Sequence, residues 1–340
     1  MKFVSFESGD SYLTGLYIDG YIYPVQAMAT SLEIVCPAKM EDLLLEWDRS
    51  LEVASHITEA VKSGKINSHL KIEDVKLLSP VPRPTSCRDG YAFRQHVMTA
   101  RRNRGVEMIP EFDEYPVFYF TNHLAVFGPG EIVLEEDHFK SLDFELECAI
   151  VIGKEGKNIT SSEADNYIAG FMVMNDLSAR VLQMEEMKLN LGPAKGKDFA
   201  TTFGPFMVTP DELADAASKG EYGNVYSLSM KAFHNGKQIS EGNVNQMNWT
   251  FAELIERASY GVMLHPGDVI GSGTVGTGCY LELNGTAALE ARKKGESYTP
   301  VWIKEGDSIS LEIERLGVLT NTFKNAGTGY SILKKKKKVN

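Results

Sequence analysis

Cysteine is scarce in this 340-residue sequence, and the few cysteines lie far apart. The chain has four of them, none in a CxxC or similar metal-binding spacing: Cys36, Cys87, Cys148 and Cys279. Scattered thiols of this kind are typical of reduced proteins of the cytosol and not of disulfide-rich secreted domains. The sequence therefore predicts neither a disulfide framework nor a zinc site built on cysteine spacing.

Long apolar runs and an excess of basic charge are lacking as well. No stretch of about 18 apolar residues occurs, so we expect neither a membrane-spanning segment nor an export signal, and we predict a cytoplasmic protein. The net charge of −11 argues against nucleic-acid binding, because phosphates are held by clustered Lys and Arg. Five lysines at residues 334–338 are the exception, and we interpret residues 332–340 as a solvated basic tail.

The length and a hydrophobic content of 43% indicate a folded protein with two domains. Short strands are predicted near the start, at residues 2–6, 12–18 and 21–23. Apolar residues at helical spacing predict an amphipathic helix over residues 41–62. Three prolines within residues 78–84 indicate a boundary. We therefore expect a small N-terminal α+β domain over residues 1–78 and a larger domain over residues 79–331.

Strand patterns dominate the larger domain. Strands are predicted at residues 117–127, 144–153, 170–175, 226–233, 269–273, 279–283 and 308–313. Capping patterns at Thr160 and Thr209 open two short helices, and a third is expected over residues 248–259. Asn235-Gly236 between two strand-like runs predicts a hairpin. The predicted fold class is a β-rich α+β protein.

Acidic residues at two places suggest a metal site. Asp143, Glu145 and Glu147 alternate with apolar residues, so in a strand they would share one face. Such a face is more often simply exposed to solvent. A second apolar stretch ends at Asp176, which could instead cap the helix that follows. Hard divalent ions need several carboxylate oxygens that converge on one point, and acids from two strands could supply them.

Three further residues are candidates for chemistry. Asp89, which would be unremarkable in a loop, precedes His96 by seven residues. An imidazole can gain and lose a proton near neutral pH, which makes His96 the best candidate for a general base, although a single histidine is more often structural. Lys197 lies in a segment rich in small residues, and by itself it reads as an ordinary surface lysine.

Taken in order along residues 79–322, these segments resemble the fumarylacetoacetate hydrolase family. The resemblance implies metal ligands at Asp89, Glu145, Glu147 and Asp176. It implies a catalytic set of His96, Glu282, which orients the histidine, and Lys197. It implies substrate contacts at Tyr91, Tyr119, Arg180, Gln183 and Thr274. The sequence departs from the family enzyme of tyrosine breakdown at Met187 and Gly105, and from isomerase and decarboxylase members at Thr121, so the substrate stays open.

The resemblance also implies a fold, a cofactor and an activity. We expect a mixed β-sandwich or β-roll catalytic domain of that family, a divalent metal (Mg²⁺ or Mn²⁺, with Ca²⁺ as a further candidate) and a homodimer. The expected activity is hydrolysis of a carbon–carbon bond in a small anionic 1,3-dioxo acid by water that His96 activates. The alternatives are isomerisation or decarboxylation of 2-oxo dicarboxylic acids or oxaloacetate on the same scaffold, and a non-catalytic metal-binding module.

Overall fold

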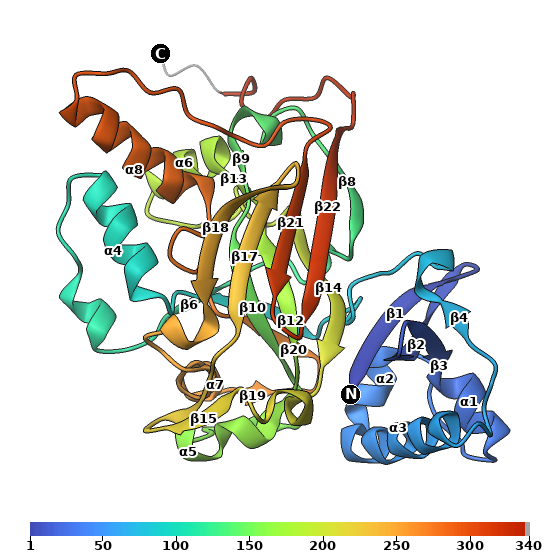
Figure 1. Cartoon of the computed structure of the whole chain (residues 1–340). Coiled ribbons are helices and arrows are strands. Elements are labelled where there is room, and N and C mark those ends of the chain that lie inside the picture. The colour runs from blue at the N-terminus through green and yellow to red at the C-terminus, as the bar shows by residue number, and fades with distance from the viewer. Residues whose placement is uncertain (337–340) are drawn as a thin grey trace.

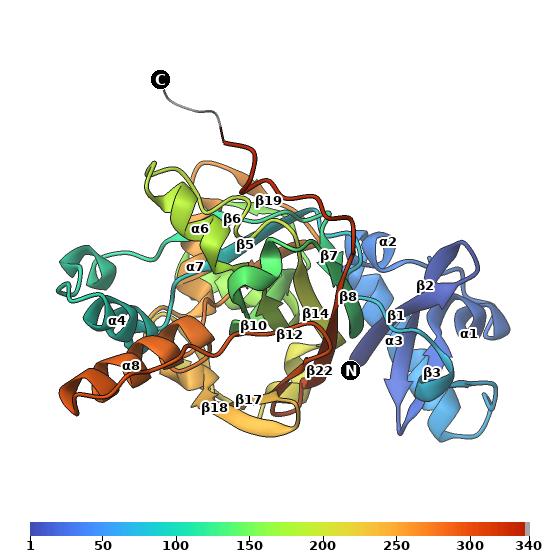
Figure 2. The same cartoon turned by 90° about the horizontal axis from the view of Figure 1, so that it is seen from above.

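The computed structural model describes residues 1–336 and shows the strand-rich α+β fold that the sequence predicts (Figures 1 and 2). Residues 337–340, which include Lys337 and Lys338 of the predicted basic tail, lie outside the described residues. Among the tail lysines that are described, Lys334 lies 3.6 Å from Glu136 and Lys336 pairs with Glu185. These contacts are between largely exposed side chains, so they contribute little to stability.

An eleven-stranded mixed sheet forms the centre of the molecule. Its strands follow in the order β4 (Leu70–Lys71), β3 (Tyr21–Pro24), β2 (Ser11–Ile18), β1 (Lys2–Ser8), β14 (Thr201–Val208), β12 (Ile168–Asp176), β10 (Leu146–Ile152), β20 (Asp268–Gly271), β5 (Ser86–Gly90) and β6 (Phe118–Phe120), and β7 (Val126–Phe127) also pairs with β14. Most neighbours are antiparallel, but β20 and β5 are parallel. The order places strands that are far apart in the sequence side by side.

A second sheet of five strands packs over the first (Figure 1). Its order is β18 (Lys237–Asn243), β17 (Ser229–His234), β21 (Ser308–Ile313), β22 (Gly317–Asn325) and β8 (Gly130–Leu134). Ile150 and Phe171 of the first sheet share a fully buried apolar cluster with Leu311 of the second. The turn between β17 and β18 has positive φ at Asn235 and Gly236, which confirms the predicted hairpin.

The other strands form three small two-stranded sheets. These are β9 (Leu142–Asp143) with β13 (Ser178–Ala179), β11 (Gly156–Lys157) with β19 (Met263–Leu264), and β15 (Ala217–Gly220) with β16 (Gly223–Tyr226). The α-helices are α1 (Val25–Ser31), α2 (Met40–Leu45), α3 (Trp47–Lys62), α4 (Arg94–Asn103), α5 (Ser161–Ala164), α6 (Arg180–Met187), α7 (Phe251–Ser259) and α8 (Tyr280–Lys293). Of these, α4 and α8 lie side by side away from the N-terminal helices, as both views show.

The N-terminal segment forms a lobe beside the larger part in Figure 1, with the three predicted strands β1 to β3 paired in order. Lys2 and Phe3 of β1 pair with Val208 and Met207 of β14, so the strands of the lobe extend the central sheet. Trp47 and Ala54 of the lobe's helices belong to one buried cluster with residues of the central strands. The domain boundaries at residues 78 and 331 stay predictions.

Several predicted elements differ from the structure. The helix expected over residues 41–62 is divided at Glu46 into α2 and α3. The capping pattern at Thr209 opens a 3₁₀-helix, Pro210–Leu213, and the strand expected over residues 117–127 is reduced to β6 and β7. The strand predicted at residues 279–283 is wrong, because Tyr280 begins α8. The aromatic and leucine residues at the start of this segment favour a strand. In the structure a distant carboxylate, described below, accepts hydrogen bonds from the first backbone N–H groups and so caps a helix there.

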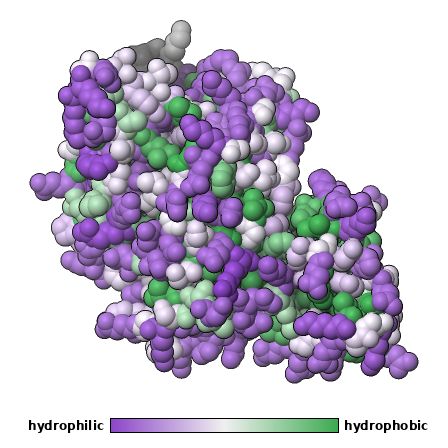
Figure 3. Space-filling model, in the orientation of Figure 1, coloured by the Kyte–Doolittle hydropathy of each residue, from purple (hydrophilic) through white to green (hydrophobic). Residues whose placement is uncertain are grey.

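The surface in the orientation of Figure 1 is mainly hydrophilic, with small scattered apolar patches (Figure 3). Such patches are ordinary for a folded protein. Within residues 1–336, no helix is both long enough and apolar enough to cross a bilayer.

Candidate metal centre and active site

Four acidic side chains meet at the centre of the main sheet. Asp89 comes from β5, Glu147 from β10 and Asp176 from the end of β12, while Glu145 lies in the short irregular segment between β9 and β10. Each offers one carboxylate oxygen, and these oxygens all lie within 4.8 Å of one another. All four residues are buried, at most 6% exposed. The structure therefore brings together the four residues that the resemblance implies as metal ligands.

The cluster has the donor chemistry of a site for a hard divalent cation. In the described part of the chain, Glu147 Oε2 and Asp176 Oδ1 are buried and have no hydrogen-bond partner. A buried carboxylate oxygen without a partner costs free energy, and a cation between the four carboxylates would remove that cost. Oxygen-only ligands are those that Mg²⁺, Mn²⁺ and Ca²⁺ prefer. The residues present thus fit the metal that the sequence predicts.

Polar neighbours hold the carboxylates in place from the protein side. The backbone N–H of Gly273 donates to Asp89 Oδ1 at 3.1 Å, and Thr274 Oγ1 donates to Glu147 Oε1 at 3.2 Å. Gly273 has a φ of +77°, and a Cβ there would lie 2.6 Å from the carbonyl oxygen of Gly90, so this turn requires glycine. Thr274, predicted to contact substrate, is therefore placed at the metal cluster.

Two buried cations compensate part of the negative charge. Lys197 donates to Glu145 and, at 2.5 Å, to Asp176 Oδ2. Arg180 donates to Glu145 Oε1 at 2.7 Å. Lys197 is only 4% exposed, so it is not the surface lysine that its sequence context alone suggested. The predicted substrate residue Tyr119 also donates to Asp176.

Burial and mutual repulsion change the proton affinity of these acids. Burial raises the pKa of Asp89 to about 7, and the charge of Asp176 adds to the rise. Burial also raises the pKa of Glu147 well above its usual value, with Asp89 as the next cause. Burial acts on Glu145 in the same direction, but Lys197 and Arg180 outweigh it and lower the pKa of that carboxyl. A cation entering the cluster would therefore displace protons.

The raised pKa predicts how the stability of the metal-free protein depends on pH. The carboxyl of an unfolded Asp titrates near about pH 4, whereas folded Asp89 titrates near 7. Between these values the folded state binds more protons than the unfolded state, so this residue makes stability decrease as the pH rises. We expect urea unfolding to show a steeper loss of stability from pH 4 to 7 for the wild type than for Asp89→Asn. Equal slopes would contradict the prediction.

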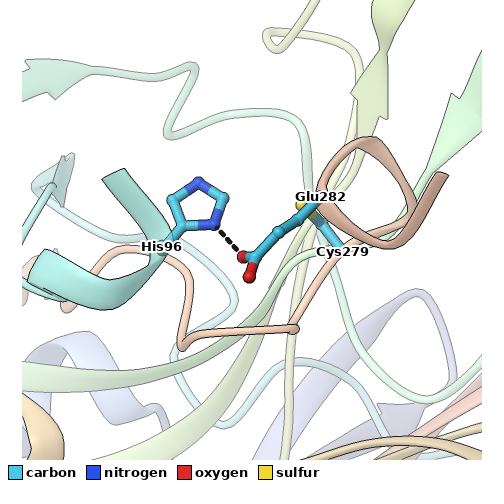
Figure 4. Close-up of side chains that lie close together, drawn as sticks. All are labelled: His96, Cys279 and Glu282. Carbon is cyan, nitrogen blue, oxygen red and sulfur yellow. Dashed lines mark hydrogen bonds and ion pairs between the residues drawn. The ribbon is translucent and has the colours of Figure 1, made fainter. Parts of the chain in front are cut away.

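Beside the acidic cluster, His96 and Glu282 form a buried pair (Figure 4). His96 Nδ1 lies 2.8 Å from Glu282 Oε2, and both side chains are at most 7% exposed. His96 is in the first turn of α4 and Glu282 in the first turn of α8, which pack against each other. The carboxylate can hold the ring in one orientation and favour a proton on Nδ1, so Nε2 can accept a proton. The two residues are therefore close together, as the resemblance implies.

The remaining predicted substrate residues lie around these groups. The ring of Tyr91 meets that of His96 edge-on, with centroids 6.0 Å apart. Gln183 Oε1 accepts from Arg180 at 2.9 Å. Their contact with substrate stays a prediction, as do the roles assigned to the other site residues.

Asp143 is the residue whose role the sequence missed. It alternates with Glu145 and Glu147, but the chain is irregular at residues 144–145 and Asp143 lies outside the acidic cluster. Its carboxylate accepts the backbone N–H groups of Tyr280 and Leu281 at 2.6 and 2.9 Å, which caps the start of α8. It also accepts from Arg180 Nε at 2.8 Å. Because Arg180 in turn binds Glu145, Asp143 links the helix of Glu282 to the acidic cluster.

Replacing Asp143 by asparagine should therefore be strongly destabilising. Asparagine keeps the size but leaves the buried Arg180 with less negative charge, and breaking such a pair costs about 3–5 kcal/mol. Asp215→Asn is a matched control, since Asp215 also binds an arginine, Arg315, at 2.8 Å but is mostly exposed. Its loss should cost less than about 1 kcal/mol. Denaturant unfolding compares the two, and similar losses would contradict the linking role of Asp143.

The structure is a strand-rich α+β fold with a buried acidic site at its centre, and comparison with known proteins gives its family. The family model described as "Fumarylacetoacetate (FAA) hydrolase C-terminal" matches residues 85–324. The chain belongs to the fumarylacetoacetate hydrolase family, as the resemblance indicated, and is an enzyme of that superfamily.

Several of the similar proteins are named oxaloacetate tautomerases. The chain is 28% identical to oxaloacetate tautomerase YisK of Bacillus subtilis (strain 168) over 94% of this chain and 99% of the relative. It is 34% identical to the human mitochondrial oxaloacetate tautomerase FAHD2A over 84% of this chain and 79% of the relative. Because that human relative is mitochondrial, the cytoplasmic location stays a prediction.

Solved structures share the fold. A putative HpcE protein from Mycobacterium smegmatis has a TM-score of 0.70 at 23% identity and covers 96% of this chain and 100% of its own. Maleylpyruvate hydrolase from Sphingobium sp. SYK-6, solved with manganese(II) and pyruvate, has a TM-score of 0.66 at 21% identity, with 96% and 99% covered.

Proposed function

We propose that this protein interconverts the keto and enol forms of a small 2-oxo dicarboxylic acid of the oxaloacetate type, with a divalent metal held by Asp89, Glu145, Glu147 and Asp176. The observation that carries the proposal is the buried His96–Glu282 pair beside an acidic cluster that retains carboxylate oxygens without partners. Two relatives with high coverage are named for this reaction. From the sequence alone, this chemistry is an alternative to the expected hydrolysis.

Different residues of the chain have different roles in the proposed proton transfer. His96 accepts the proton from the carbon next to the 2-oxo group, and Glu282 stabilises the imidazolium that forms. Lys197 supplies positive charge for the enolate oxygen, and it needs little rearrangement because Glu145 and Asp176 already hold it. The proton on His96 then returns to carbon or passes to oxygen. A bound Mg²⁺ or Mn²⁺ would act as a Lewis acid on the 2-oxo group and orient the substrate.

Hydrolysis of a carbon–carbon bond in an acylpyruvate or fumarylacetoacetate-type acid is the second candidate. The same His96–Glu282 pair favours it, because a base held in one orientation can equally take a proton from water. The two reactions differ in their products. Tautomerisation keeps every carbon–carbon bond, whereas hydrolysis consumes one water and releases two smaller acids.

Proton NMR in deuterated water separates these reactions. With oxaloacetate and Mg²⁺ or Mn²⁺, a tautomerase accelerates the exchange of the C3 hydrogens for deuterium above the rate without enzyme, and the carbon skeleton stays intact. With acylpyruvates and fumarylacetoacetate, a hydrolase yields pairs of product acids. Chelator-treated enzyme is the control for both. The proposal is rejected if the metal-loaded enzyme does not accelerate exchange, and the second candidate replaces it if cleavage products form instead.

The homodimer that the resemblance implies stays a prediction. Sedimentation of the purified protein measures its mass in solution against the 37.7 kDa of one chain.

A further inference from the structure

A second group of metal-binding side chains lies beside the acidic cluster. His96, Cys279 and Glu282 each offer one ligand atom, these atoms lie within 4.8 Å of one another, and all three residues are buried (Figure 4). The histidine comes from α4, while Cys279 is the N-cap of α8 and Glu282 is in its first turn. The proposed reaction uses His96 and Glu282 but gives no role to the thiol.

We propose that His96, Cys279 and Glu282 form a second cation site, which takes a thiophilic divalent ion such as Zn²⁺, and that its occupation inhibits the enzyme. Imidazole nitrogen, thiolate sulfur and carboxylate oxygen are all ligands that zinc accepts, and three protein ligands leave a fourth position for water. The four carboxylates next to it are an oxygen-only set, which suits Mg²⁺ or Mn²⁺. Two adjacent sites with different donor atoms can therefore select different metals.

The three ligand atoms, which lie within 4.8 Å of one another, would have to reach tetrahedral spacing to hold zinc. In a tetrahedral site with ordinary bond lengths the ligand atoms lie roughly 3.3–3.6 Å apart. His96 Nδ1 and Glu282 Oε2 are 2.8 Å apart, so a cation would separate them by about half an ångström more. The ion would replace the hydrogen bond of this pair.

Occupation of the site removes the proton that the pair shares and requires the thiolate form of Cys279. Zinc then binds Nδ1, Sγ and a carboxylate oxygen, and the thiol proton and the proton of the pair pass to solvent. A histidine coordinated through Nδ1 with its carboxylate occupied by the metal no longer has the partner that stabilises its protonated form. We infer that His96 cannot transfer a proton while zinc is bound to it.

The direct test is cobalt binding, which needs no turnover and is therefore independent of the proposed function. Co²⁺ serves as the probe, in the presence of enough Mg²⁺ to saturate the acidic cluster. A cobalt–thiolate bond produces a charge-transfer band in the near ultraviolet. We expect the wild type to show this band and Cys279→Ser to lack it. Serine is a favoured N-cap residue, so the variant should keep the start of α8. Cys36→Ser, at another buried thiol, is the matched control and should keep the band.

Inhibition by Zn²⁺ in excess Mg²⁺ gives the functional readout. Changes around a metal ligand commonly alter affinity about 10- to 100-fold, so loss of the thiolate should raise the half-inhibiting Zn²⁺ concentration at least tenfold. Activity of Cys279→Ser without zinc should equal that of the wild type. The proposal is overturned if the wild type shows no thiolate band, if Cys279→Ser keeps it, or if both proteins are inhibited at the same Zn²⁺ concentration. If the wild type shows the band but has no activity, the proposed function is rejected while the second cation site is still supported.

Discussion

Replacement of His96 by glutamine should lower turnover about 10²- to 10⁴-fold, the range that a positioned general acid–base group contributes. Glutamine fills a similar volume and can hydrogen-bond to Glu282, but it cannot accept a proton near neutral pH. Binding of Mg²⁺ should be unchanged, because His96 is not part of the four-carboxylate cluster. Steady-state kinetics with each candidate substrate, together with a metal titration by calorimetry, measure the two effects separately.

His265→Gln is the matched control. His265 Nδ1 also lies 3.0 Å from a glutamate, Glu155, but both of these side chains are about half exposed or more. Its loss should leave turnover within a factor of about two, as expected for a surface position away from the site. Glu282→Gln should reduce turnover less than His96→Gln does, since it removes the orienting charge and leaves the base. Full activity of His96→Gln would end the assignment of His96 as the base.

Neutralising one buried carboxylate of the cluster should abolish the response to metal. Glu147 is fully buried, and Glu147→Gln keeps its shape while removing one of four ligand charges. For the wild type, a metal at about 100 times its dissociation constant stabilises the folded state by about 2.7 kcal/mol, so thermal unfolding should shift upward on adding Mg²⁺ or Mn²⁺. For Glu147→Gln we expect little shift and a loss of activity of more than about 100-fold. Treatment of the wild type with chelator should produce the same inactivity, reversed by added metal.

Asp137→Asn provides a control for the loss of a buried carboxylate as such. Asp137 is 3% exposed and accepts hydrogen bonds from Lys140, Ser331 and the backbone of Leu333, away from the acidic cluster. This variant should be less stable than the wild type but should keep its metal-induced shift. If Glu147→Gln responds to metal as the wild type does, the four carboxylates are not the metal site.

Local patterns in the sequence predicted much of the fold because they depend on neighbouring residues. The hairpin at Asn235-Gly236 and the capped helix α7, whose Thr250 and Glu253 form a capping box, follow from turn and capping chemistry within a few residues. The start of α8 could not be predicted in this way. Its first N–H groups are accepted by Asp143, which is 137 residues distant in the chain.

The sequence by itself determined the strand-rich class, the family, and the residue types that the chemistry needs. Only the tertiary structure decided which of them meet. It buried Lys197 against two carboxylates, paired His96 with Glu282 across 186 residues, separated Asp143 from the acids beside it, and placed Cys279 next to the histidine. The physical reason is that alternation and capping are local, whereas a buried site forms where strands and helices distant in sequence pack together, and that packing depends on the whole core.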